Sequence, residues 1–281
     1  MSNGFGTDSG IRWTYAFVDR PVGDLGAAQA FWAAVTGTRV SETRGEQGEF
    51  VTLLPGTGDA CVKVQGVASG DGGAHLDFAV EDVDAFVGAA SALGATVVGA
   101  YDGWSVLRSP AGQLFCAVPW HGEAVRPAVV DGSRLDQVSI DIPPAAHGTE
   151  VAFWERLTAW DSLAGSLPEF HVLRPPAGLP VRILLQRLGT ERPAASAHLD
   201  LACADIGATG ARHRQLGATV VARHAHWTVM RDPAGGTYCL TGRDPETGGL
   251  PKATPTADPA QRPIPYAHAT SVGAASGAAS G

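Results

Sequence analysis

The sequence predicts an α+β protein made of two tandem copies of one domain, each containing two β-α-β-β-β modules. Two observations predict this class. Residues 74–118 and 197–241 align without a gap, and 20 of the 45 aligned positions are identical. The chain of 281 residues is also long enough for two domains of ordinary size. A repeat with so long a period indicates a duplicated domain rather than a solenoid.

The repeat also sets the expected boundaries. His75 matches His198 at an offset of 123, and the pair Phe31-Trp32 matches Phe153-Trp154 at an offset of 122. We expect a flexible N-terminus over residues 1–10, a first domain over 11–120 and a linker over 121–133. A second domain follows over 134–243, and a tail rich in Pro, Ala, Gly and Ser over 244–281.

The elements of a copy are clearest in its second occurrence. Residues 134–142 alternate polar and apolar, which predicts a half-buried strand, and residues 148–158 place their apolar side chains on one helical face. Two strands around a Pro-Pro-Ala-Gly turn follow in residues 170–188. Residues 197–204 form the next predicted strand. A helix then begins after Asp205 and ends at Gly217, and three more strands complete the copy.

We therefore expect the modules to form curved mixed sheets around a cleft, with the helices outside. The sequence leaves open whether the modules pair within a copy or across the two copies.

Composition and the N-terminal sequence indicate which partners and which cellular compartment to expect. The formal charge of −8 argues against nucleic acid or an anionic membrane as a partner, and no run of about 18 apolar residues predicts a membrane span. The N-terminus lacks the pattern of a secretory signal, so a cytoplasmic protein is expected, as a monomer or homodimer. The four cysteines show no CxxC spacing and are expected to be reduced.

Four strings carry a family resemblance. They are FW in the first helix of a copy, HLD opening the fifth strand, LGAT after the second helix, and W-x-V-x-R-[SD]-P-A-G-x-x-[FY]-C at the end. With them, residues 11–243 resemble the vicinal oxygen chelate superfamily of glyoxalases and bleomycin-resistance proteins. The resemblance implies a small-molecule cleft but no single reaction, because the superfamily includes lyases, isomerases, dioxygenases and drug-binding proteins.

The resemblance also implies where a metal would be bound, on the first, fourth, fifth and eighth strands of a copy. The sequence offers Trp13, Gln65, His75 and Cys116 in the first copy, and Gln137, Gln186, His198 and Cys239 in the second. No carboxylate stands at these positions, and a divalent ion prefers anionic oxygens or several imidazoles. We therefore expect no cofactor, with a divalent metal as the lesser alternative.

The candidate site residues lie on the strands. His75 and His198 are the candidate catalytic residues, and Asp77 and Asp200 share a strand face with them. The competing interpretation is a histidine that is only hydrogen-bonded within the sheet. The candidate ligand-binding residues are Trp13, Tyr15, Gln65, Asp77, Trp104, Cys116, Gln137, Ser139, Gln186, Asp200 and Trp227.

The first strands of the two copies differ most. Trp13, Tyr15 and Phe17 share one face in the first copy, and we matched them to Gln137, Ser139 and Asp141 in the second. An aromatic face suits a planar ligand, whereas a polar face suits hydrogen bonding. The alternative is that the aromatic residues are buried in an interface between the copies.

Two functions follow from these observations. The first is a metal-independent protein that binds or sequesters a planar or hydrophobic metabolite or drug. The second is an enzyme, a lyase, isomerase or dioxygenase, that acts from the second domain around Gln137, His198 and Gln186 with or without a divalent metal.

Overall fold

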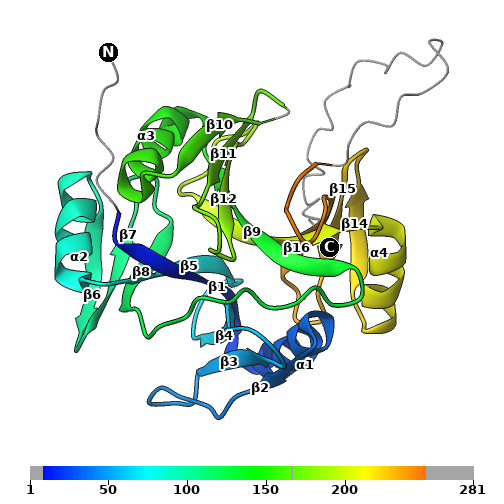
Figure 1. The fold of residues 1–281 in the computed structure, drawn as a ribbon. Coiled ribbons are helices and arrows are strands. Elements are labelled where there is room, and N and C mark those ends of the chain that lie inside the picture. The colour runs from blue at the N-terminus through cyan, green and yellow to red at the C-terminus, as the bar shows by residue number, and fades with distance from the viewer. Residues whose placement is uncertain (1–8, 166, 251–281) are drawn as a thin grey trace, which may run out of the picture. The chain divides into compact units, whose positions relative to one another are not determined.

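The computed structural model describes residues 9–165 and 167–250, and in them each copy of the repeat forms one eight-stranded mixed sheet (Figure 1). The strand order is β2-β3-β4-β1-β5-β8-β7-β6 in the first sheet and β10-β11-β12-β9-β13-β16-β15-β14 in the second. The two orders are identical once the numbering is shifted by eight, so the predicted duplication and the predicted α+β class are confirmed. Residues 1–8 and 251–281, which include most of the predicted tail, lie outside the described residues.

Each copy follows the predicted order of two β-α-β-β-β modules. The elements of the first copy are β1 (Ile11–Pro21), α1 (Leu25–Thr36), β2 (Thr38–Val40), β3 (Phe50–Pro55), β4 (Val62–Val67), β5 (Gly73–Val80), α2 (Val83–Ala92), β6 (Thr96–Tyr101), β7 (Trp104–Arg108) and β8 (Leu114–Pro119). Those of the second copy are β9 (Ser133–Ile142), α3 (His147–Thr158), β10 (Asp161–Ala164), β11 (Phe170–Arg174), β12 (Arg182–Arg187), β13 (Ser196–Cys203), α4 (Ile206–Gln215), β14 (Thr219–Arg223), β15 (Trp227–Arg231) and β16 (Thr237–Gly242). No helix in the described part of the chain is long and apolar enough to span a membrane.

Local sequence explains the helix ends. Asp205 caps α4, because its carboxylate accepts a hydrogen bond from the backbone N–H of Ala208 at 2.9 Å, and Asp82 caps α2 in the same way. Beyond α4, Gly217 has a φ of +96°, a conformation that favours glycine. The short edge strands β2 and β10 have no clear pattern of their own in the sequence, and β10 is exposed along its whole length.

The modules pair by hydrogen bonds within a copy but share an aromatic core across the copies. Hydrogen bonding joins the modules within a copy, because β1 pairs with β5 and β9 pairs with β13. The aromatic core, however, forms across the copies. Trp32 of α1 packs edge-on against Tyr238 of β16, with ring centroids 5.2 Å apart. Trp154 of α3 packs in the same manner against Phe115 of β8, at 5.0 Å.

A buried ion pair also connects the copies. The guanidinium of Arg20 on β1 donates to the Asp232 carboxylate over 2.6 and 3.0 Å, and the Trp32 indole donates to the same oxygen at 3.0 Å. The Arg20 and Asp232 side chains are only 2% and 0% exposed. Gly236 makes room for this arrangement, because a Cβ there would lie 1.9 Å from the guanidinium carbon of Arg20.

The equivalent contact on the other side of the repeat has different chemistry. There the buried Glu150 of α3 accepts from the Trp154 indole at 2.7 Å and from the backbone N–H of Ala111 at 2.8 Å. Both contacts place a carboxylate beside the helix tryptophan, but the carboxylate comes from a turn in one case and from a helix in the other. The two interfaces are therefore related in position and distinct in sequence.

Candidate functional site

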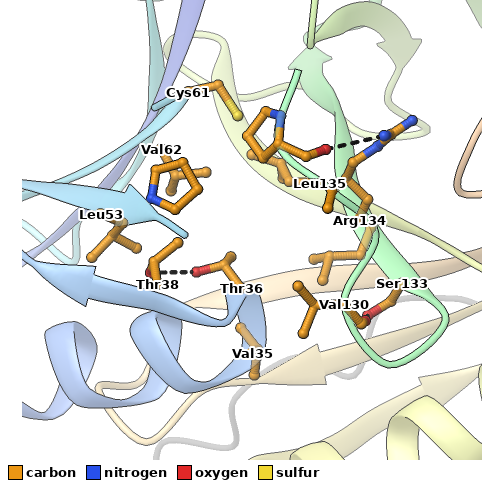
Figure 2. Close-up of a pocket in the computed structure, with 14 residues that line it drawn as sticks. Val35, Thr36, Thr38, Leu53, Cys61, Val62, Val130, Ser133, Arg134 and Leu135 are labelled. Carbon is orange, nitrogen blue, oxygen red and sulfur yellow. Dashed lines mark hydrogen bonds between the residues drawn. The ribbon is translucent and has the colours of Figure 1, made fainter. Parts of the chain in front are cut away.

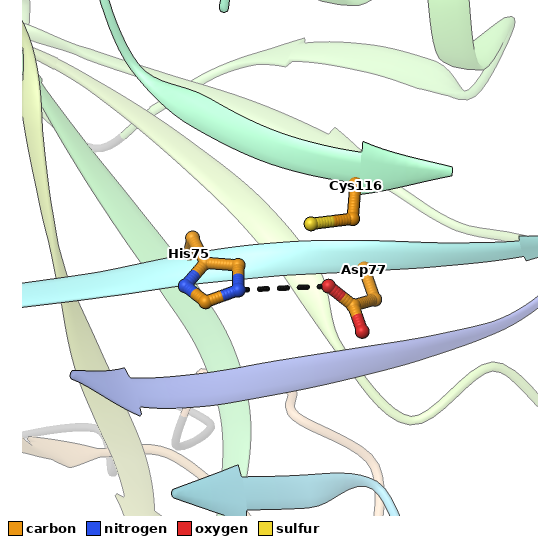
Figure 3. Close-up of side chains that lie close together, drawn as sticks. All are labelled: His75, Asp77 and Cys116. Atoms are coloured by element: carbon orange, nitrogen blue, oxygen red, sulfur yellow. Dashed lines mark ion pairs between the residues drawn. The ribbon is translucent and has the colours of Figure 1, made fainter. Parts of the chain in front are cut away.

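The strongest cluster of reactive side chains occurs twice, once in each sheet. His75 and Asp77 of β5 meet Cys116 of β8 in the first copy (Figure 3). His198 and Asp200 of β13 meet Cys239 of β16 in the second. In each group the imidazole nitrogen, the carboxylate oxygen and the sulfur all lie within 4.8 Å of one another. We call these the first and the second His-Asp-Cys cluster.

Strand geometry brings each cluster together. Residues two apart in a strand share a face, so the histidine and the aspartate of the HLD string point the same way and the leucine points to the core. The parallel neighbour then adds the cysteine, because Asp77 pairs with Cys116 and Asp200 pairs with Cys239 in the strand register. The predicted alternation of the HLD strand is therefore confirmed.

A second aspartate orients each histidine. The Nδ1 atom of His198 lies 3.0 Å from the Asp141 carboxylate on β9, and the Nδ1 atom of His75 lies 2.7 Å from that of Asp19 on β1. Hydrogen bonding at Nδ1 leaves Nε2 to face the cluster. Asp19 was not among the predicted site residues, and Asp141 was not expected to orient a histidine, although the two match at the offset of 122 that also relates the tryptophans.

The strand register corrects our matching of the first strands. Phe17 lies opposite His75 and Ser139 lies opposite His198, so Phe17 corresponds to Ser139, and Tyr15 corresponds in the same way to Gln137. Our match of Trp13 to Gln137 was wrong by two residues. The offset of 122 that relates Phe31-Trp32 to Phe153-Trp154 gives the correct match, whereas our match used an offset of 124.

The two clusters also change the metal argument. We expected no carboxylate among the possible ligands, yet Asp77 and Asp200 each contribute one to their cluster. Their Oδ1 atoms are buried and have no hydrogen-bond partner among the described residues. Leaving such an atom unpaired is unfavourable, so the two clusters each contain an unused acceptor.

The other oxygen of each aspartate is held, but by different groups. In the second cluster, Oδ2 of Asp200 accepts hydrogen bonds from the Gln137 amide and from the Ser139 hydroxyl, the latter at 2.8 Å. In the first cluster, Oδ2 of Asp77 lies 3.3 Å from the ammonium of Lys63 on β4. The sequence analysis did not single out Lys63.

Aromatic residues of the first copy surround that lysine. The Lys63 ammonium lies 3.7 Å from the centre of the Tyr15 ring and 5.2 Å from that of Phe17. The His75 ring stacks on Phe17, with centroids 4.3 Å apart. Trp13 is fully buried, and its indole donates to the carbonyl of Ala60 at 2.8 Å. The predicted aromatic face exists, but the protein itself already covers it.

The remaining predicted residues lie around the clusters or apart from them. Gln65 is opposite Asp19 in the register, and Gln186 is opposite Asp141, so both glutamines border a cluster. Trp104 stacks on Tyr101 at 4.2 Å. Trp227 stacks on His224 at 4.4 Å and meets the edge of Phe170.

Two cavities stand apart from both clusters. One of about 30 Å³ lies between the end of α1 and the segment that joins the copies, and the buried thiol of Cys61 borders it (Figure 2). It is far smaller than the 300–1,000 Å³ typical of ligand pockets. The other, of about 370 Å³, is more open, and Trp104 and Tyr101 line it together with Glu81 and Asp84. Neither cavity is lined by a cluster histidine.

Burial and charge set the protonation of the clusters. Burial lowers the pKa of His198, but the charge and hydrogen bond of Asp141 outweigh it, so the pKa lies well above its ordinary value. Burial, then the nearby Asp200 carboxylate, raise the pKa of the Cys239 thiol, while His198 lowers it. In the second cluster these effects favour the charged imidazole and the neutral thiol.

Comparison with known proteins identifies the fold. The model of the glyoxalase-like domain family matches this chain twice, over residues 15–118 and 137–241. The chain belongs to the glyoxalase-like domain family. The two matches together cover most of the chain and contain both His-Asp-Cys clusters. No curated protein sequence matches this chain.

Solved structures share the glyoxalase-like fold at low identity. A Mn(II)-bound glyoxalase from Novosphingobium aromaticivorans is 18% identical with a TM-score of 0.58, covering 87% of this chain and 88% of that one. A 2,3-dioxygenase from Pseudomonas sp. KL28 is 15% identical with a TM-score of 0.58, covering 87% and 98%. A variant of 4-hydroxymandelate synthase from Streptomyces coelicolor is 14% identical with a TM-score of 0.55, covering 84% and 93%. At this level the likeness concerns the fold alone.

The second cluster of this glyoxalase-like chain has donor chemistry that fits a zinc ion. Imidazole nitrogen, carboxylate oxygen and thiolate sulfur are the three types of ligand that zinc takes in proteins. Two such nitrogen and oxygen atoms around a tetrahedral ion lie about 3.4 Å apart. The distance from His198 Nε2 to Asp200 Oδ1 is 3.4 Å. The orientation of His198 by Asp141 adds the carboxylate that commonly supports a zinc-binding histidine.

Proposed function

We propose that this glyoxalase-like protein is an enzyme that transforms a small molecule at the second His-Asp-Cys cluster with the help of one zinc ion. The observation that carries the proposal is the buried Oδ1 atom of Asp200, which accepts no hydrogen bond from the described residues and lies 3.4 Å from Nε2 of His198. The three side chains that would hold the ion are His198, Asp200 and Cys239. Three protein ligands leave the fourth position of a tetrahedral ion for a substrate or water.

The neighbouring residues have distinct roles in this proposal. Asp141 accepts a hydrogen bond from the Nδ1–H of His198 and so leaves the lone pair of Nε2 facing the cluster. Gln137 and Ser139 fix one oxygen of Asp200 and leave the other toward the centre. When bound, zinc would supply a Lewis acid that polarises a substrate oxygen or lowers the pKa of a water molecule.

Charge balance supports the same assignment. An ion with two positive charges, a carboxylate, a thiolate and a neutral imidazole have no net charge together. Such neutrality matters because an unpaired charge in a buried site is strongly unfavourable. The His198 side chain is 16% exposed, against 10% for His75, so the second cluster is also the more accessible of the two.

The competing function is the metal-independent binding of a planar or hydrophobic molecule by the first domain. The positions of Lys63 and His75 against Tyr15 and Phe17 weaken it, because a ligand would have to displace a side chain to reach these rings. In that function the two clusters are hydrogen-bonded ion networks and nothing more. The experiment below separates the two proposals.

The test begins with the metal content of the full chain. Protein purified without chelators and dialysed should contain about one zinc ion per chain. His198→Ala and Cys239→Ser should each lose it, whereas the matched variant His75→Ala should keep it. A melting curve for each variant confirms that the fold persists. Metal-free protein, or a zinc content that is the same in His198→Ala, would contradict the proposal and favour metal-independent binding.

A second measurement asks whether the ion can bind a small molecule. Replacement of zinc by cobalt(II) should give a thiolate-to-cobalt absorption band in the near ultraviolet that Cys239→Ser abolishes. Addition of acetohydroxamate, a ligand with two adjacent oxygen donors, should then change the visible cobalt spectrum, because an open position allows it to coordinate. An unchanged spectrum would show a closed, structural site and would refute the enzymatic role.

A further inference from the structure

The two clusters differ at one position that controls charge. In the strand register Lys63 lies opposite Phe17, and Leu184 lies opposite Ser139. Since Phe17 and Ser139 correspond to each other, Lys63 and Leu184 occupy the same place in the two copies. A cation therefore contacts the carboxylate of the first cluster, where the second cluster has an uncharged side chain. The arginines whose charges reach Asp200, Arg182 and Arg243, are each paired with Asp136.

The surroundings hold the lysine in place. Its side chain is 17% exposed, and its ammonium contacts the Asp77 carboxylate at 3.3 Å and the face of the Tyr15 ring at 3.7 Å. An ion pair and a cation–π contact both hold the ammonium at this location. The lysine bonds to Oδ2 of Asp77 and leaves Oδ1 without a hydrogen-bond partner among the described residues.

We propose that the Lys63 ammonium takes the place of a metal ion in the first domain, so that only the second domain binds zinc. This inference rests on the proposed function of the second cluster. The argument is electrostatic, because a divalent ion in the first cluster would lie within a few ångströms of a fixed positive charge. Lys63 already neutralises Asp77, so the first cluster has less negative charge to offer an ion. We expect its zinc affinity to be at least ~100-fold weaker than that of the second cluster.

Apart from the lysine, the first cluster has the same three types of possible zinc ligand as the second. His75, Asp77 and Cys116 are all buried, and Asp19 orients His75 as Asp141 orients His198. The distance from His75 Nε2 to Asp77 Oδ1 is 3.6 Å, close to the 3.4 Å of the second cluster. Removal of the lysine charge should therefore be enough to create a second zinc site.

The experiment exchanges the two residues and counts zinc by elemental analysis of the full chain. Wild type should hold about one ion per chain, Lys63→Leu about two, and Leu184→Lys none. The double variant Lys63→Leu/Leu184→Lys should return to about one. Its cobalt(II) form should then lose the thiolate absorption band on Cys116→Ser and keep it on Cys239→Ser, the reverse of wild type.

The outcomes separate this inference from the proposed function. Two ions per wild-type chain, or one ion in both wild type and Lys63→Leu, would overturn the role of Lys63 and leave the second site intact. No ion in wild type but one in Lys63→Leu would support the role of Lys63 and refute the proposed function. Leu184→Met controls for a long uncharged side chain at that position and should keep its zinc, so a loss there would overturn the electrostatic argument.

Discussion

The ion pair between Arg20 and Asp232 connects the two copies in a fully buried setting, so Asp232→Asn should be strongly destabilising. The substitution removes the charge but keeps the size of the side chain. It leaves the Arg20 guanidinium, which is 2% exposed, without its carboxylate, and it weakens the acceptor of the Trp32 indole. Breaking a buried pair by removing one partner typically costs about 3–5 kcal/mol. We expect the free energy of unfolding to fall by that amount and Tm to fall by about 10 °C.

Urea denaturation followed by circular dichroism measures the effect, and two variants serve as controls. Asp161→Asn breaks the exposed pair of Asp161 with Arg174 and should cost less than about 1 kcal/mol. The double variant Arg20→Met/Asp232→Asn removes both buried charges, so its cost should be smaller than the sum of the two single variants by about 1–3 kcal/mol. A cost for Asp232→Asn as small as that of Asp161→Asn, or strict additivity, would refute the reasoning.

Two further predictions concern the same interface. Gly236→Ala would place a Cβ against the Arg20 guanidinium and should lower the free energy of unfolding, measured by urea denaturation, by about 1–3 kcal/mol. The control is Gly210→Ala in α4, whose Cβ would make only an ordinary contact at 3.6 Å and should leave stability unchanged or slightly higher. Equal effects of the two variants would contradict the steric argument. Burial, and then Arg212, lower the pKa of His213 to about 4 in the folded state. As pH falls below about 6.5, His213 therefore takes up a proton in the unfolded chain before it does so in the folded protein. The free energy of unfolding should fall by about 2 kcal/mol between neutral pH and pH 5. His213→Gln should flatten this dependence in denaturation curves measured from pH 7 to pH 5, and an unchanged slope would show that other groups cause it.

Much of the fold could be predicted because its signals are local. The alternation around HLD, the cap at Asp205 and the repeat itself each depend on residues close in sequence, and the structure confirms the strands and helices that they indicate. The packing partner of Trp32 is Tyr238, more than two hundred positions away. A helical pattern shows that Trp32 faces a core but not which copy supplies that core, so the cross-copy core could not be predicted.

The site could be predicted only in part for a related reason. HLD identified the histidines and their aspartates, and the repeat identified the cysteines. Lys63, within an alternating strand, has the pattern of a solvent-exposed lysine, and only the fold places the Tyr15 ring beneath it. We counted only the histidine of each HLD string as a possible ligand, whereas the fold also brings Asp77 and Asp200 into the clusters.

The unequal interfaces mean that neither half of the chain is suited to pair with a copy of itself. In a dimer of first halves, Arg20 would meet Ser109 and Gln113 where it now meets Asp232 and Gly236, so it would lose its counter-charge and collide with a side chain. In a dimer of second halves, Glu150 would face Asp232, and two buried carboxylates would repel each other. We therefore expect mixtures of separately expressed halves to yield the mixed pair alone.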